Sequence, residues 1–533
     1  MAERARWWAL TAVSLSTLMA YLDNNVTNVA LPTIERSLHL SVSGLEWIVS
    51  SYLLVLGGLL LVGGRIADVY GRRRMFLAGL VIFTLSSLAA GLAGSGGVLI
   101  AARAVQGLGA ALVLPASLAI IAATFTDTRE RTTAIGISGA IGALGLALGP
   151  ALGGLISQHF HWGWIFLINV PLGVITLAIS IPSIAESRAD APAPSGRAGS
   201  RPPTAMARLD VPGLTASALT LFSLTYALIE GGDKGWTSPL ILGAFTVAAV
   251  TLAVFLVIES RSAYPMIPLS IFRNTAFSGG IGTMMIWSFG VLGIYFFTSL
   301  YLQGNLGFSP TKAGLAFVPM ALCLALAAVL SPRVVPLIGS NRTVALGMAV
   351  MTVGLALFAR LGVGATFGDL LPGFILFGLG AGLLNVPLTN AILGGVPTER
   401  AGIASALFNA SREVAGLLGV TVVGAVLRST EGAALRSGTR PAQAFIDGYH
   451  SGLWLTLGLL AAGIVLSYVT LRPTRKPADS ASGNLEAAEL GLAELVLGEP
   501  LAPLGDAARG AGQSGAARSG LTGGPAVPSP QQG

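Results

Sequence analysis

The chain has 533 residues, of which 53% are apolar and 10% are charged. Soluble domains carry roughly 25% charged residues, so this composition, with a mean hydropathy of +0.76, argues against a soluble enzyme. The single cysteine, Cys323, excludes a disulfide scaffold within the chain, and four histidines without ligand spacing argue against a structural zinc site. The net charge of +7 is spread between apolar segments, so no nucleic-acid partner is expected.

Long apolar runs recur along the first 471 residues. A membrane-spanning helix needs about 20 apolar residues. The first run, from Trp7 to about Asn28, lacks a small-x-small cleavage site, so we interpret it as a retained helix and not as a signal peptide. Thirteen further runs cover approximately residues 45–64, 75–93, 98–122, 133–156, 162–184, 212–231, 238–259, 276–300, 312–332, 343–361, 369–391, 402–426 and 450–471. The runs predict an all-α polytopic membrane protein with fourteen transmembrane helices.

Arginine and lysine residues are distributed unevenly between the loops. With the N-terminus inside the cell, twenty of them fall on the cytoplasmic side and seven, including Arg428, fall on the outer side. Positively charged loops remain preferentially in the cytoplasm, and an even number of spans returns the chain to its starting side. We therefore expect a multi-pass protein of the cell membrane with both termini in the cytoplasm.

The first span ends in a polar stretch, Leu22–Pro32, that contains Asp23. An ionisable residue inside a span is costly and needs a reason. A carboxyl group removed from water can hold or release a proton near neutral pH, which is what a proton-coupled carrier requires. Asp23 is therefore a candidate proton carrier, and a purely structural role in holding helices together stays open.

The segment from Gly64 to Arg74 is expected to form the loop between the second and third spans. Gly64 and Gly71 permit a tight turn, and Asp68 can cap or pair locally. The basic run at residues 72–74 keeps the loop in the cytoplasm. The spacing of these glycine, acidic and basic residues is more specific than a simple topology signal.

The fourth span contains Arg103 and, one turn later, Gln106. Arginine is permanently charged and cannot itself carry the proton. It can, however, stabilise a nearby carboxylate and organise Gln106 by hydrogen bonding. Arg103 is thus expected to assist proton coupling.

Glycines recur through the fifth span. Small residues at helical spacing let two membrane helices approach closely, while Pro150 removes a backbone donor and weakens the helix. The pattern predicts either tight packing or a bending and gating surface. The residues concerned are Gly142, Gly145, Gly149, Pro150, Gly153 and Gly154.

Two polar segments are not spans. Residues 185–211 are rich in Pro, Ser, Gly and Arg, which predicts a flexible cytoplasmic linker. Residues 473–533 predict a disordered cytoplasmic tail, in which 485–497 can form one short helix. Between them, Glu230 lies beside two glycines at a predicted outer end, where a structural role is favoured.

Arg412 and Glu413 are neighbours in the thirteenth span. Adjacent side chains on a helix point about 100° apart, so the two need not pair with each other. Glu413 is either a second proton carrier or the counter-ion of Arg412, and both interpretations stay open.

These residues resemble the motifs of the major facilitator superfamily, specifically of its fourteen-span drug:proton antiporters. Residues 64–74 resemble motif A, Arg103–Ala111 resembles motif B, and residues 145–154 resemble the antiporter motif C. Residues 22–32 are similar to the first-span signature of the fourteen-span members. The resemblance extends from about residue 8 to residue 472.

The chain departs from the family pattern at several positions. Val69 stands where motif A often has a basic residue, Asn25 replaces a common threonine, and Glu413 stands where relatives often carry glutamine. The second-half counterpart of motif A keeps Gly339 and Arg342 but has no acidic residue. A motif A gate is therefore expected on one side only.

The resemblance implies two six-helix bundles, at about 1–184 and 276–472, with two helices at 212–259 inserted between them. It also implies that one bundle rocks against the other around a central cavity. Proton coupling is assigned by analogy to Asp23 and Arg103, with Glu413 the second candidate from its place in a span, and export over uptake is assigned to motif C. The implied cytoplasmic gate consists of Gly64, Asp68, Gly71, Arg72 and Arg73. The expected cargo cavity is lined by Asn28, Gln106, Trp287, Tyr295, Asn385, Asn409 and Arg412.

The function implied by this resemblance is export of a small hydrophobic or drug-like compound across the lipid bilayer in exchange for protons. The exporter is expected to act as a monomer without a cofactor. A metabolite or siderophore exporter of the same fold stays open, as does a transport-dead sensor that signals through the tail. An enzyme is not expected, because no nucleophile, base and orienting group occur together on one predicted loop or helix end.

Overall fold

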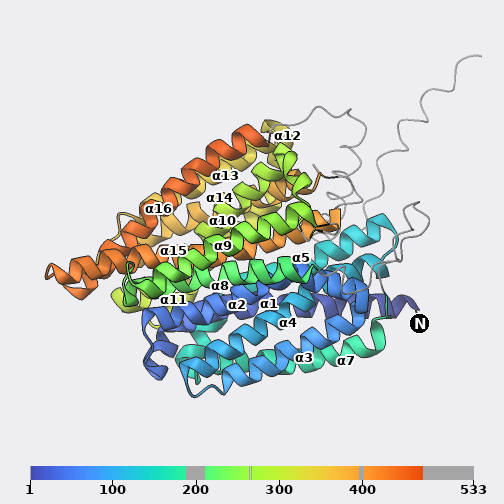
Figure 1. Cartoon of the computed structure of the whole chain (residues 1–533), viewed down its shortest axis with the longest axis horizontal. Coiled ribbons are helices and arrows are strands. Elements are labelled where there is room, and N and C mark those ends of the chain that lie inside the picture. The colour runs from blue at the N-terminus through green and yellow to red at the C-terminus, as the bar shows by residue number, and fades with distance from the viewer. Residues whose placement is uncertain are drawn as a thin grey trace, which may run out of the picture. The chain divides into compact units, whose positions relative to one another are not determined.

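Long helices aligned side by side make up nearly all of the described chain (Figure 1). The computed structural model describes residues 2–187, 210–262, 265, 267–394, 396 and 401–471. Residues Met1–Arg475 form one compact unit. Of the expected linker, only its first three residues and its last two are described; the tail at 473–533, with its short helix expected at 485–497, lies outside the described residues.

The described helices follow the order of the predicted spans. They are α1 (Ala2–Leu38), α2 (Val42–Tyr70), α3 (Arg72–Gly91), α4 (Gly96–Thr124), α5 (Thr128–His159), α6 (Trp164–Leu167), α7 (Asn169–Ser183), α8 (Val211–Lys234), α9 (Pro239–Arg261), α10 (Thr275–Leu300), α11 (Pro310–Ala316), α12 (Val318–Ile338), α13 (Ser340–Phe358), α14 (Phe367–Gly394), α15 (Ala401–Arg436) and α16 (Pro441–Thr470). Two short segments, η2 (Leu269–Arg273) and η3 (Tyr301–Asn305), flank α10.

Within the described ranges, thirteen helical segments are long and apolar enough to cross a membrane. The fourteenth expected span is α1, which is 37 residues long. Its polar residues, Asp23 and Asn28 among them, make α1 less apolar than the other spans. The all-helical, multi-pass fold predicted from the apolar runs is confirmed.

Two of the expected spans are each built from two helices. The sixth span breaks at Ile168 between α6 and α7, and the tenth breaks at Phe317 between α11 and α12. Pro171 and Pro319 follow these breaks by three and two residues. Proline has no amide hydrogen to donate to the carbonyl four residues earlier, so the helical hydrogen-bond ladder is interrupted at both places.

Several helices extend beyond their apolar runs, which corrects the expected boundaries. Helix α2 continues to Tyr70 and not to 64, so Gly64 and Asp68 lie in a helix and not in a loop. The turn before α3 consists of Gly71 alone, at φ 115°. The corresponding turn between α12 and α13 is Gly339, at φ 88°. Positive φ values of this kind favour glycine because it has no Cβ.

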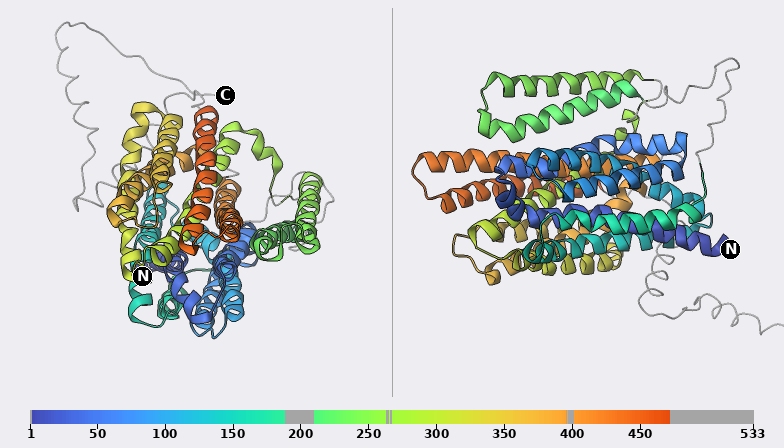
Figure 2. Two further views of the ribbon diagram at one scale, coloured as in Figure 1. Left: turned by 90° about the vertical axis from the view of Figure 1, so that its left-hand side faces the viewer. Right: turned by 90° about the horizontal axis from the view of Figure 1, so that it is seen from below.

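The helices pack as two sets. Helices α1–α7, here called the N-terminal half, pack mainly on one another, and α10–α16, the C-terminal half, do the same. The halves meet where α2 packs on α15 and where α5 packs on α11. Helix α9 packs on α8, which in turn packs on both α2 and α15. The α8–α9 pair therefore stands beside the two halves (Figure 2).

Candidate functional site

A buried polar cluster surrounds Asp23 in the middle of α1. Asp23 is 1% exposed and forms an ion pair with Arg103 of α4, which is 0% exposed. The same carboxylate accepts a hydrogen bond of 2.8 Å from Nε2 of Gln106 and another of 2.8 Å from Nδ2 of Asn169 in α7. Three donors from two neighbouring helices therefore converge on one carboxylate inside the N-terminal half.

Further contacts of Arg103 and Gln106 extend this cluster to two more helices. Nη1 of Arg103 donates to Oε1 of Gln106 at 2.6 Å, and Nε donates to the carbonyl of Ile48 in α2 at 3.3 Å. The guanidinium group lies 4.3 Å from the ring centre of Tyr52, also in α2. Nε2 of Gln106 donates to Oγ of Ser87 in α3 at 2.8 Å. The cluster thus joins α1, α2, α3, α4 and α7.

Sequence reasoning selected Asp23, Arg103 and Gln106 but missed Asn169 and Ser87. Both missed side chains are fully buried. The available signal was an uncharged polar residue inside an apolar span, which is weak because such residues often bond to their own helix. Gln106 was expected in the cargo cavity, and in the structure its side chain bonds to Asp23 and to Ser87.

The chemical capacity of this cluster depends on the charge of Asp23. A buried ion pair is held by mutual attraction and by hydrogen bonds to its remaining atoms, and removing one charge leaves the other uncompensated. Protonation of Asp23 would cancel its attraction to Arg103 while leaving the guanidinium charged. A single proton can therefore alter the contacts among five helices.

A second ion pair lies within α15 and contacts α1 of the other half. Nη2 of Arg412 in α15 donates to Oε1 of Glu413 at 2.7 Å, and Nε donates to the same oxygen at 3.1 Å. Nη2 also donates to the hydroxyl of Tyr21 in α1 at 2.9 Å. The long side chains bend toward each other despite their helical spacing. Glu413 is paired with Arg412 in this structure, which favours the counter-ion interpretation of the two that the sequence leaves open.

The remaining expected cargo residues are spread over α1, α10, α14 and α15. Trp287 and Tyr295 lie in α10, and their Nε1 and hydroxyl atoms are buried without a hydrogen-bond partner. Asn28 is buried in α1, where its Nδ2 donates to a backbone carbonyl and its Oδ1 has no partner. Nδ2 of Asn409 donates within its own helix at 2.9 Å, and Asn385 is half-buried in α14.

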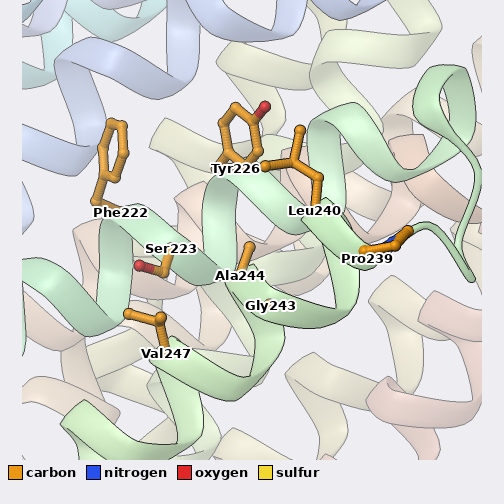
Figure 3. A pocket seen from close by; sticks show the side chains of 8 residues that line it. All are labelled: Phe222, Ser223, Tyr226, Pro239, Leu240, Gly243, Ala244 and Val247. Carbon is orange, nitrogen blue, oxygen red and sulfur yellow. The ribbon is translucent and has the colours of Figure 1, made fainter.

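Of two hollows in the described part of the chain, only the smaller is lined by an expected cargo residue. Tyr295 lines a cavity of about 10 Å³ with Phe317, Phe374 and neighbouring apolar residues, which is too small for a drug-like molecule. A larger hollow of about 410 Å³ lies between α8 and α9 (Figure 3). Its lining is Phe222, Ser223, Tyr226, Pro239, Leu240, Gly243, Ala244 and Val247, and none of these residues was expected to line the cargo cavity.

The residues of the expected cytoplasmic gate bond to partners in, or directly after, the N-terminal half. Nε and Nη2 of Arg72 donate to Oδ1 of Asp68 at 3.0 and 2.9 Å, across the Gly71 turn. The amide of Arg73 donates to Glu186 at 3.1 Å, and its Nη2 donates to the carbonyl of Ile181 at 2.8 Å. These contacts join the start of α3 to the end of α7. All of these partners lie in the N-terminal half or directly after it.

Gly64 was expected to permit a tight turn but lies inside α2, and close helix packing occurs instead at its neighbour Gly63. A methyl group added at Gly64 would lie 3.5 Å from Pro115, an ordinary contact. A methyl group at Gly63 would lie 2.1 Å from the carbonyl oxygen of Ala111 in α4. Glycine is therefore required at residue 63 by helix packing.

The motif C glycines of α5 face two different helices. Gly145, Gly149 and Gly153 lie against α1, where an added methyl group would come within 2.5 to 2.9 Å of another atom. Gly154 lies against α11 of the other half, 2.2 Å from the carbonyl oxygen of Pro310 by the same measure. On α11, Gly314 packs equally closely on the carbonyl of Pro150. Motif C therefore forms a contact between the halves as well as within one.

Sequence reasoning also missed a buried ion pair between Glu46 of α2 and Arg428 of α15. Arg428 was assigned to an outer loop because the apolar run ends near 426. The helix α15 continues to Arg436, so Arg428 lies inside it with a side chain only 8% exposed. Its partner is 382 residues away in the sequence, a separation that no local pattern reveals.

Comparison with known proteins agrees with this architecture. The family model of the Major Facilitator Superfamily matches residues 13–420. The puromycin resistance protein pur8 of Streptomyces alboniger is 34% identical over 487 residues, covering 89% of this chain and 93% of that protein. The multidrug resistance protein Stp of Mycobacterium tuberculosis (strain CDC 1551 / Oshkosh) is 36% identical, covering 80% and 76%. The tetracenomycin C resistance and export protein of Streptomyces glaucescens is 33% identical, covering 80% and 77%.

Two solved structures share the fold at low sequence identity. The POT family transporter PepTSo has a TM-score of 0.60 at 14% identity, covering 87% of this chain and 98% of that one. A bacterial homolog of the human lysosomal transporter Spinster, in an inward-facing and unoccupied conformation, has a TM-score of 0.59 at 17% identity, covering 88% and 97%. The chain is a multi-pass membrane transporter that belongs to the Major Facilitator Superfamily.

Proposed function

We propose that this protein exports hydrophobic, drug-like compounds or antibiotics across the cytoplasmic membrane in exchange for protons, by alternating access. Its N-terminal and C-terminal halves rock against each other around a central cargo site. Both termini lie in the cytoplasm, so the end at which α1 begins faces inward and the end at which α2 begins faces outward.

The observation that carries the proton-coupling part of this proposal is the burial of Asp23 beside Arg103. Intramembrane carboxylates mark proton pathways in pumps and transporters. Asp23 is positioned to alternate between a charged state paired with Arg103 and a neutral state that releases it. The Asp23 side chain is fully buried and accepts hydrogen bonds from α4 and α7, whereas Glu413 bonds to its own neighbour Arg412, so we assign proton transfer to Asp23 and charge compensation to Glu413.

The drug-export part rests on the relatives. The names of the three relatives described above refer to resistance or export and, in two cases, to puromycin and tetracenomycin C. Cargo of that kind carries hydrogen-bonding groups on an apolar frame. The unpartnered polar atoms of Trp287, Tyr295 and Asn28 can bind such groups once the halves separate.

The test is expression in a drug-sensitive bacterial strain. We expect higher inhibitory concentrations of puromycin or tetracenomycin C than with an empty vector, and less drug retained in the cells. A protonophore should abolish the difference in retention, because it removes the proton gradient. Unchanged inhibitory concentrations over a broad panel of toxic compounds would instead favour a metabolite or siderophore exporter of the same fold.

A further inference from the structure

The ion pair between Glu46 and Arg428 joins the two halves at one end of the molecule. Glu46 is fully buried in the first turns of α2, and Arg428 is almost fully buried in the last turns of α15. Charges withdrawn from water are retained only when they are paired and hydrogen-bonded. The ion pair is therefore an integral part of the contact between α2 and α15.

The inserted helix α8 is a third member of this contact. Nη2 of Arg428 donates to the carbonyls of Leu228 and Ile229 at 3.1 and 3.0 Å. These carbonyls belong to α8 and lie outside both halves. The guanidinium group thus joins three helices that are distant in sequence: α2, α8 and α15.

Two glycines leave the space that these charged groups occupy. A methyl group added at Gly424 of α15 would lie 2.2 Å from Oε1 of Glu46. A methyl group at Gly232 of α8 would lie 3.2 Å from Nε of Arg428. A side chain at Gly424 would displace the Glu46 carboxylate, whereas a methyl group at Gly232 would require only a small shift of the Arg428 side chain.

Further polar contacts join the start of α2 to the end of α8. Nε1 of Trp47 donates to Oε1 of Glu230 at 2.9 Å, and Oγ of Ser43 donates to Oδ2 of Asp233 at 2.5 Å. Lys234 forms an ion pair with Glu230 at 3.0 Å. Helix α8 is therefore attached to the N-terminal half beside the ion pair.

Apart from the bond of Arg412 to Tyr21 near the middle of α1, the other side-chain hydrogen bonds described between the halves lie toward the same end. Oγ of Ser299 and Nε2 of Gln303 donate to the backbone carbonyls of Asn28 and Val29, in the second half of α1, at 3.0 and 2.8 Å. The amide of Thr311 donates to Oε1 of Gln158 at 3.1 Å, joining α11 to α5. Among the described residues, the motif A pair at the opposite end bonds only within its own half. The two halves are therefore closed against each other at the end where α2 begins.

We propose that Glu46 and Arg428 form a latch that holds this end closed, and that α8 is part of the latch. Alternating access requires the same end to open, which separates α2 from α15 and breaks the ion pair. Because Arg428 is also bound to α8, the inserted helices take part in gating and are not passive additions. This inference rests on the proposed alternating-access function.

The test measures the distance across this end in the full-length protein, without cargo and without a proton gradient. Spin labels are placed at Gly97→Cys and Gly364→Cys in a Cys323→Ala background. Both glycines are exposed, and a side chain added at either meets no atom within 4 Å. Gly97 follows the α3–α4 turn in the N-terminal half, and Gly364 lies between α13 and α14 in the C-terminal half.

Three changes break the latch in different ways. Glu46→Gln removes one charge, the double change Glu46→Gln with Arg428→Gln leaves no lone charge, and Gly424→Ala keeps both charges but fills their space. We expect each change to raise the population with a long distance between the two spin labels, relative to the population with a short distance, by about tenfold or more. Loss of a buried charge pair at an interface has an effect of this size.

The control is Glu130→Gln, which removes the exposed ion pair between Glu130 and Arg6 within the N-terminal half. It should leave the distance distribution unchanged. If the double change and Gly424→Ala both give the distribution of the unmodified protein, the latch is refuted. That result would leave drug export untouched, whereas absence of export with a shifted distribution would refute the proposed function and keep the latch.

Discussion

At the scale of single residues, the buried charge of Arg103 is stabilised by its ion pair with Asp23. Both side chains are withdrawn from water, and an unpaired buried charge is among the most destabilising changes that a protein can undergo. Asn169 and Gln106 supply the remaining donors to Asp23. These contacts stabilise the charged form of Asp23. Protonation of Asp23 would weaken them and so change how the neighbouring helices contact one another.

Replacing one member of this pair should destabilise the protein more than replacing both. We expect Arg103→Gln to lower the free energy of unfolding by about 3–5 kcal/mol, because Asp23 is left without its counter-ion. The double change Asp23→Asn with Arg103→Gln should cost less than Arg103→Gln alone, because it leaves no buried charge unpaired. Denaturant unfolding of the purified protein measures both, and strictly additive losses would argue against a direct pair.

Glu413 should behave as a counter-ion and not as a proton carrier. We expect Glu413→Gln to keep accumulation of drug driven by a pH gradient, while changing the drug concentration needed for half-maximal rate, because Arg412 then carries an uncompensated charge near Tyr21. Transport rates at several drug concentrations separate the two effects. Complete loss of gradient-driven accumulation, with binding retained, would return Glu413 to the coupling site.

At the scale of helices, α5 forms the contact that relates motif C to the opposite half. Gly154 should not tolerate a side chain, since an added methyl group would lie 2.2 Å from the carbonyl of Pro310. We expect Gly154→Ala to lower both thermal stability and transport rate by separating α5 from α11.

A matched control lies on the same helix. Gly139 is exposed, and an added methyl group meets no atom within 4 Å. Gly139→Ala should therefore leave transport unchanged and raise stability by about 0.5–1 kcal/mol, because alanine is the better helix former. Equal behaviour of the two variants would contradict a packing role for Gly154.

The helices themselves were largely predictable from sequence, and their contacts were only partly so. Apolar runs identified the spans because a bilayer imposes a minimum length on them. They ended α15 too early, since Arg428 looks like a boundary until its partner Glu46 is known. Asp23 and Arg103 stood out as intramembrane charges, whereas Asn169, being neutral, did not. Pairing between distant helices is a property of the packed structure and not of a local pattern.

At the scale of the whole molecule, residues Met1–Arg475 contain all the described helices and polar clusters. A chain that ends at Arg475 should fold and transport drug at the rate of the full-length protein. Unfolding temperature and transport in vesicles measure this. Retained transport with loss of a cellular signal would support a sensor role for the tail, and loss of transport would contradict the self-sufficiency of the first 475 residues.

Proton coupling through Asp23 is tested most directly in vesicles that contain the purified protein and have an acidic interior. Protons leaving the vesicle should drive puromycin inward, beyond the amount that this weak base reaches in protein-free vesicles. The comparison sets Asp23→Asn against Asp447→Asn, a carboxylate that bonds to Gln443 on the surface. We predict that Asp23→Asn abolishes the protein-dependent accumulation while puromycin binding survives, and that Asp447→Asn accumulates normally. Equal accumulation by the unmodified protein and Asp23→Asn would contradict the account.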